Sequence, residues 1–123
     1  MDKFLMVGLG GALGAVGRYA ISMLPSKSAF PFLTLLTNML GALAIGFIAG
    51  LSSRSVMAEK WTLFWKTGVC GGFTTFSTFS LEAWGLLEQK NFIGAGVYVL
   101  LSVVLCIAGA VLGQYIGCRF ARP

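Results

Sequence analysis

Histidine is absent from this sequence of 123 residues, and only 11% of the residues are charged. The lack of histidine removes the usual proton carrier near neutral pH and a common metal ligand. A soluble domain has about 25% charged residues, so the low charge argues against a soluble globular protein. The sequence also shows no nucleophile–base pair and no cluster of metal-ligating side chains, so we expect no enzyme.

Cysteine and acidic residues are scarce as well, with three of the former and four of the latter. Cys70, Cys106 and Cys118 lie far apart, in or beside apolar runs, and match no zinc or disulfide spacing. We interpret them as buried, reduced thiols. The net charge of +5 comes from basic residues near the ends of apolar runs rather than along a stripe. We therefore expect no nucleic-acid partner.

What the chain has in abundance is apolar residues, at 57%, and glycine, at 17 residues. A helix needs about 20 apolar residues to cross a bilayer, and four segments meet this requirement. Residues 1–123 are therefore predicted to form one all-α transmembrane domain with four spans, joined by short connections. The predicted spans are residues 4–24, 32–51, 61–87 and 92–119.

Glycine pairs with G-xxx-G spacing occur in every predicted span, and such pairs allow helices to pack closely. The pairs are Gly10 with Gly14, Gly46 with Gly50, Gly68 with Gly72, and the series Gly109, Gly113 and Gly117. Four short helices packed in this way leave little room for a pore between them. We therefore expect the functional unit to be an oligomer, most simply a two-fold dimer.

The third span contains an unusual stretch, residues 71–80, in which two glycines are followed by phenylalanines and hydroxyl residues. Phe73, Phe76 and Phe79 recur every third residue, which on one helix would place them on neighbouring positions of one face. Glycines and hydroxyls disfavour a continuous helix, and a broken helix in a bilayer must be buried or line a wet cavity. The stretch is thus either the wall of a transport path or a site of close helix packing.

Polar residues within the other spans allow two interpretations each. Arg18 is either a side chain that reaches the membrane interface or part of an electropositive vestibule. The Asn38 amide either bonds a neighbouring helix or donates to a passing anion. Tyr98 and Ser102, one helical turn apart, are either interfacial anchors or part of a track of hydroxyls. Glu82 is the only acid within a span, and such an acid can carry a proton or a cation.

The sequence resembles one known family, the CrcB/Fluc fluoride channels. The resemblance is carried by Gly-Gly-Phe-Thr-Thr-Phe-Ser-Thr-Phe-Ser at residues 71–80, by residues 14–19 and by residues 37–41. It extends over essentially the whole chain. It implies an inverted (antiparallel) homodimer of dual topology in the bacterial inner membrane, with the third helix broken near its middle. It also implies passive, electrogenic export of cytoplasmic fluoride, which lowers fluoride toxicity.

The resemblance also implies roles for individual residues. Phe76 and Phe79 would line the fluoride paths together with Asn38, and Arg18 would lie at the vestibule. The remaining pore residues implied are Ser77, Thr78, Tyr98 and Ser102. Cys106 lies where a further hydroxyl would be expected. A structural sodium ion at the dimer centre would be held by the backbone carbonyls of Gly71 and Thr74 from both subunits.

Two other hypotheses remain beside the fluoride channel. The first is a small proton-coupled multidrug exporter, also built as an inverted dimer, for which Glu82 is the candidate acid. The second is an assembly subunit or holin-like membrane protein that transports nothing. The fluoride-channel hypothesis predicts fluoride flux, whereas the hypothesis of an assembly subunit or holin-like protein predicts none.

Overall fold

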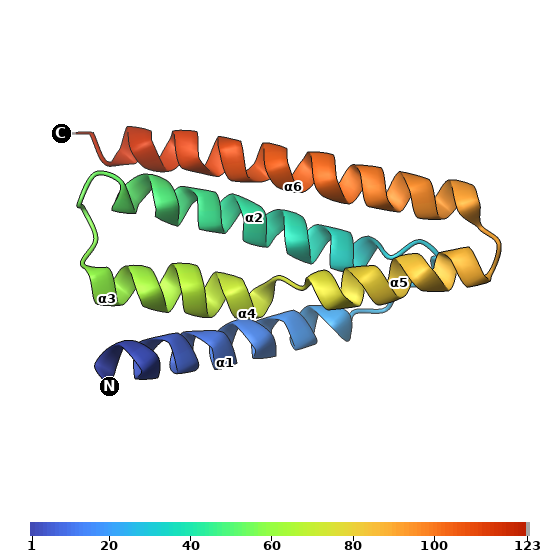
Figure 1. Ribbon diagram of the computed structural model, residues 1–123, viewed down its shortest axis with the longest axis horizontal. Helices are drawn as coiled ribbons and strands as arrows, with labels where there is room; N and C mark the ends of the chain where they lie inside the picture. The colour runs from blue at the N-terminus through green and yellow to red at the C-terminus, as the bar shows by residue number, and fades with distance from the viewer. Residues whose placement is uncertain (123) are drawn as a thin grey trace.

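The computed structural model describes residues 1–122, and the regular structure in this range is entirely helical. The chain forms four rods that lie side by side, with successive rods running in opposite directions, as Figure 1 shows. This arrangement confirms the predicted all-α fold with four helices. The rods are α1 (Asp2–Ser22), α2 (Phe32–Ser52), a segmented third rod, and α6 (Phe92–Phe120).

The third rod consists of four consecutive helical pieces rather than one helix. It begins with a single turn and continues through wider π-helical turns before it is interrupted at Thr74 and Thr75, which have extended backbone conformations. Figure 1 shows the interruption as a thin connection between α4 and α5. The pieces are α3 (Glu59–Thr62), η1 (Leu63–Cys70), α4 (Gly71–Phe73) and α5 (Phe76–Glu88).

The break lies within the predicted stretch, residues 71–80, but it follows the two glycines instead of beginning at them. Gly71 and Gly72 are helical, with φ −64° and ψ −39° at Gly71, and the break follows Phe73. Gly72 instead permits close packing, because a Cβ atom there would overlap the Gly11 carbonyl of α1. The break separates the three phenylalanines, since Phe73 lies on α4 while Phe76 and Phe79 lie on α5.

Glycines bring the rods into backbone contact at two interfaces. Between α2 and α6, a Cβ atom on Gly46 would overlap the Ala110 carbonyl, and one on Gly113 would overlap the Leu43 carbonyl. Between α1 and η1, a Cβ atom on Gly14 would overlap the Val69 carbonyl. The predicted close packing through small residues is therefore present in the structure.

Few large side chains are buried inside this bundle, and many apolar ones face outward. The buried cluster comprises Leu35, Leu86, Ala95 and Tyr98. Helices α1, α2 and α6 are each long and apolar enough to cross a membrane. An exposed apolar surface on a bundle of such helices suits contact with lipid rather than water. The chain is therefore a multi-pass membrane protein.

Candidate functional site

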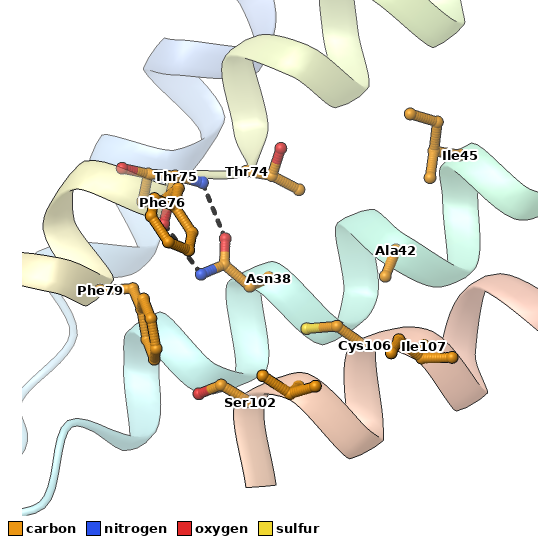
Figure 2. Close-up of a pocket in the computed structure, with 11 residues that line it drawn as sticks. Asn38, Ala42, Ile45, Thr74, Thr75, Phe76, Phe79, Ser102, Cys106 and Ile107 are labelled. Carbon is orange, nitrogen blue, oxygen red and sulfur yellow. Dashed lines mark hydrogen bonds between the residues drawn. The ribbon is translucent and has the colours of Figure 1, made fainter. Parts of the chain in front are cut away.

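The break in the third rod is held by the side chain of Asn38, which lies on α2. Its Oδ1 accepts a hydrogen bond from the Thr75 amide at 2.7 Å, and its Nδ2 donates to the Thr75 carbonyl at 3.0 Å. Figure 2 shows both bonds. A buried backbone group without a partner is costly, so the Asn38 amide replaces partners that the interrupted helix lacks. A carboxamide has two N–H donors, and one therefore remains for another acceptor.

Helix α5 restarts directly after the break because Thr75 caps its N-terminus. The Thr75 hydroxyl accepts a hydrogen bond from the Thr78 amide at 3.2 Å, which is the usual geometry of a threonine N-cap. The same hydroxyl lies 3.0 Å from the Thr78 hydroxyl and 3.2 Å from that of Ser77. Ser77 and Thr78, both predicted pore residues, thus belong to the cap of α5, and neither lines the cavity described next.

A cavity of about 420 Å³ lies beside the break, between α2, α5 and α6. Four of the predicted pore residues line it, namely Asn38, Phe76, Phe79 and Ser102, and so does Thr74, a predicted sodium ligand. Figure 2 shows these side chains around one space, with Cys106 a turn further along α6. The other lining residues are Ala42, Ile45, Thr74, Thr75, Val103, Cys106 and Ile107. Apart from the break and Asn38, the walls of this cavity are mostly apolar.

Three aromatic rings extend in a row from the cavity into the protein. The ring centres of Phe76 and Phe79 are 5.4 Å apart, and those of Phe79 and Tyr98 are 5.1 Å apart, with tilted planes in both pairs. Phe76 is 79% exposed, whereas Tyr98 is fully buried. Phenylalanine rings carry positive charge at their edges and negative charge on their faces. Anions can therefore approach such rings along their edges.

Ser102 is the one side chain with an unpaired polar atom buried in the described part of the chain. It is 8% exposed, and among residues 1–122 its Oγ has no hydrogen-bond partner. Buried hydroxyls in folded proteins are nearly always hydrogen-bonded, so an unpaired one calls for a ligand or water. Because Ser102 lines the cavity, that ligand would lie in the cavity.

A second polar cluster lies behind the rings and centres on Glu82. Its carboxylate accepts hydrogen bonds from the Thr34 hydroxyl and from the Tyr98 hydroxyl, each at 2.8 Å. The structure thus directs the hydroxyl of Tyr98, a predicted pore residue, to Glu82 rather than into the cavity with Ser102. Sequence reasoning missed Thr34, although its spacing of one helical turn from Asn38 was a usable signal.

Arg18 lies close to the break in the third rod. Its Nε donates to the Gly72 carbonyl at 3.2 Å, and its side chain is partly buried. It also lines a small cavity of about 80 Å³ together with Thr78 and Glu82. The guanidinium therefore places a positive charge beside the helix break.

Two backbone carbonyls at the break lose their usual helical partners. In a continuous helix the Gly71 carbonyl would accept from the amide of Thr75, but that amide donates to Asn38. Likewise, the Thr74 carbonyl would accept from the amide of Thr78, but that amide donates to the Thr75 hydroxyl. These are the two carbonyls that the family resemblance assigns to a cation.

The fold and the site together define a class: a small helical membrane protein whose broken third segment is braced by polar side chains beside a cavity. The model of a family described as "CrcB-like protein, Camphor Resistance (CrcB)" matches residues 5–114. The chain belongs to this family. The predicted resemblance is thereby confirmed.

Several curated relatives match almost the full length of the chain, and each bears the name "Fluoride-specific ion channel FluC". The protein of Methanococcus vannielii is 40% identical over 121 residues, covering 98% of this chain and 99% of the relative. That of Erythrobacter litoralis is 42% identical over 126 residues, covering 95% and 93%. That of Ruminiclostridium cellulolyticum is 43% identical over 118 residues, covering 93% and 91%.

Proposed function

We propose that this protein is a fluoride-specific channel that lets cytoplasmic fluoride leave the cell by passive, electrogenic flow and so lowers fluoride toxicity. The observation that carries the proposal is the cavity at the helix break, which brings two phenylalanine rings together with the Asn38 amide and the unpaired Ser102 hydroxyl. The name shared by the relatives, which specifies fluoride, supports fluoride as the transported ion. The expected location is a bacterial inner membrane.

The chemistry of the cavity suits a small anion with a strong hydration shell. A pore that passes fluoride must replace its water molecules with hydrogen-bond donors, as channels do for other ions. Ser102 offers an unpaired hydroxyl, and Asn38 retains one N–H after bracing Thr75. The edges of Phe76 and Phe79 add positive charge without a fixed cation, so the ion is attracted without being trapped.

A second copy of the chain completes the path in this proposal. In one copy the cavity is open and Phe76 is 79% exposed, although a ring that contacts an ion in a membrane needs a protein wall opposite it. An antiparallel homodimer would supply that wall from the facing copy. It would also bring the broken third rods of the two copies together near the middle of the bilayer.

A structural sodium ion fits the carbonyls at the break. Hard cations prefer oxygen ligands, and the Gly71 and Thr74 carbonyls are released from their helical partners by Asn38 and Thr75. In the dimer, both copies would contribute these oxygens to one site. Sodium there would hold the two breaks together. We expect replacement of sodium by N-methylglucamine to lower fluoride flux, and equal flux in both solutions would remove sodium from the proposal.

The competing exporter hypothesis receives less support. An exporter needs an acid that exchanges a proton for a cationic drug, whereas both oxygens of Glu82 are engaged by hydroxyls of Thr34 and Tyr98. The relatives are named as ion channels, not as exporters or enzymes. A drug gradient driven by a proton gradient in liposomes, lost in Glu82→Gln, would revive the exporter hypothesis.

Replacement of the cavity phenylalanines tests the proposed path directly. We expect Phe76→Ile and Phe79→Ile each to slow fluoride efflux from liposomes by about tenfold or more, because isoleucine has no positively charged edge. The matched control is Phe4→Ile, since Phe4 is 83% exposed on α1 and does not line the cavity. Wild-type flux in both cavity variants, with intact assembly, would exclude the rings from the path.

A further inference from the structure

Among the cysteines in the described residues, Cys106 alone lines the cavity at the helix break. Of the free cysteines in the described residues, Cys70 is 4% exposed and belongs to η1. Cys118 lies near the end of α6, where its thiol contacts the Gly50 carbonyl at 3.8 Å. Cys106 lines the cavity, and Figure 2 shows its sulfur pointing toward the side of the cavity that holds Asn38.

A second group on the same wall also lacks a partner. Ser102 precedes Cys106 by one helical turn, so the two side chains lie on the same face of α6. The Ser102 hydroxyl is buried and unpaired among the described residues, and it lines the same cavity. The wall therefore offers a soft sulfur and, beside it, a free donor.

The remaining walls favour a neutral ligand over a charged one. The apolar residues Ala42, Ile45, Val103 and Ile107 line the same cavity as Cys106. A doubly charged, hydrated cation would lose its water in such surroundings at high cost. A neutral compound of a thiophilic metal avoids this cost, and thiolates bind soft metals strongly.

We propose that Cys106 is a binding site for thiophilic metal compounds, represented by mercuric chloride, and that a metal bound there blocks the ion path. In this reaction a sulfur–mercury bond forms and one mercury–chloride bond breaks. The thiol proton and that chloride leave, and no group is oxidised or reduced. The Ser102 hydroxyl donates to the chloride that remains on the metal. The block, though not the binding, depends on the proposed channel function.

The test uses full-length protein in which Cys106 is the only cysteine, made by Cys70→Ala and Cys118→Ala. Treatment with mercuric chloride is expected to add one mercury per chain, measured by intact mass. It is also expected to lower fluoride efflux about tenfold or more relative to the same protein untreated. Dithiothreitol should restore the efflux. Cys106→Ser in the same background should take up no mercury and keep its own flux.

The outcomes separate the thiol site from the channel function. No mercury uptake by the protein that retains only Cys106 would overturn the proposed site. Uptake without loss of fluoride efflux would overturn the block. If the untreated protein passes no fluoride, the channel proposal fails, and the mass measurement alone still decides the binding site. Should the double variant fail to fold, Cys106→Ser in the otherwise natural chain must bind one mercury fewer, or the site is wrong.

Discussion

Asn38 shows how much of this site depends on one side chain. Its side-chain amide forms hydrogen bonds with both the N–H and the carbonyl of Thr75. Asn38 and Thr75 are 37 positions apart in the chain. The bonds satisfy a backbone that cannot be helical, and they leave one amide N–H for the cavity. The same residue is thus a brace for the break and a candidate ligand for the ion.

Removal of this amide should therefore affect both stability and transport. We expect Asn38→Ala to lower the free energy of unfolding by about 2–4 kcal/mol, because two partly buried backbone groups lose their partners. Fluoride efflux should fall sharply as well. Unfolding can be followed by tryptophan fluorescence during titration with a denaturing detergent.

The matched control is Asn91→Ala, which removes another asparagine cap. The Asn91 Oδ1 accepts from the Gly94 amide at 2.9 Å, at the exposed start of α6 and away from the cavity. Its loss should cost about 1 kcal/mol and leave the flux unchanged. Equal effects of the two substitutions on flux would show that Asn38 has no special role in transport.

At the scale of residues, the sequence was a better guide to which residues form the site than to which partners those residues contact. Asn38, Phe76, Phe79 and Ser102 were all predicted, and all line one cavity. The partner of Asn38 could not be predicted, because local spacing says nothing about a contact between two rods. The same reason explains why Tyr98 bonds Glu82 rather than joining the track of hydroxyls.

At the scale of helices, the structure separates two uses of glycine. Gly113 lies where α6 meets the backbone of α2, and an added Cβ atom would overlap the Leu43 carbonyl. Gly96, on the same helix, has no atom of a neighbouring helix within 4 Å of the place where a Cβ would lie. The two positions therefore form a matched pair for testing the packing of α2 against α6.

We expect Gly113→Ala to destabilise the protein by about 1–3 kcal/mol, because the two helices must move apart to admit the methyl group. Gly96→Ala should be neutral or slightly stabilising, since alanine favours the helix. The measurement is the detergent concentration at the midpoint of unfolding for each variant. A midpoint that falls equally for both would contradict the packing described here.

The broken third rod shows where sequence patterns reach their limit. Two adjacent glycines at residues 71 and 72 suggested a break at that point, yet both are helical and the break follows Phe73. Low helix propensity does not prevent a helix at Gly72, where the missing side chain allows close packing against α1. The extended conformation of Thr74 and Thr75 depends instead on capping within α5 and on Asn38 from α2.

At the scale of the whole molecule, charge is distributed unevenly between the two ends of the bundle. The start of α1, the end of α6 and the α2–α3 connection lie at one end, as Figure 1 shows. The basic residues at that end are Lys3, Arg54, Lys60, Arg119 and Arg122, against Lys27 and Lys90 in the connections at the other end. Such a bias favours a cytoplasmic N-terminus, whereas the proposed antiparallel dimer requires both orientations.

Labelling of a single introduced cysteine decides between these orientations. We expect a membrane-impermeant maleimide to label about half of the Gln89→Cys copies in sealed vesicles of uniform sidedness, in a background without other cysteines, because an antiparallel dimer displays both ends equally. Gln89 is suitable because it lies exposed between α5 and α6. Labelling of all copies or of none would contradict the antiparallel dimer.

The overall fold was easier to predict from the sequence than the assembly. The length and hydropathy of the apolar segments predicted the four rods, because a helix must be long and apolar to cross a bilayer. The assembly depends on contacts between copies, and the exposed Phe76 is the residue in one chain that points most directly to a missing wall. The pairing of copies remains a prediction for the labelling experiment.

The measurement that tests the central claim most directly is fluoride efflux from liposomes that contain the purified protein, read with a fluoride electrode. Chloride is measured in parallel, and potassium is allowed to leave through valinomycin. A passive, selective channel predicts fast fluoride loss that depends on valinomycin, with chloride retained. Fluoride loss no faster than from empty liposomes, with protein shown to be folded and supplied with sodium, would contradict the account.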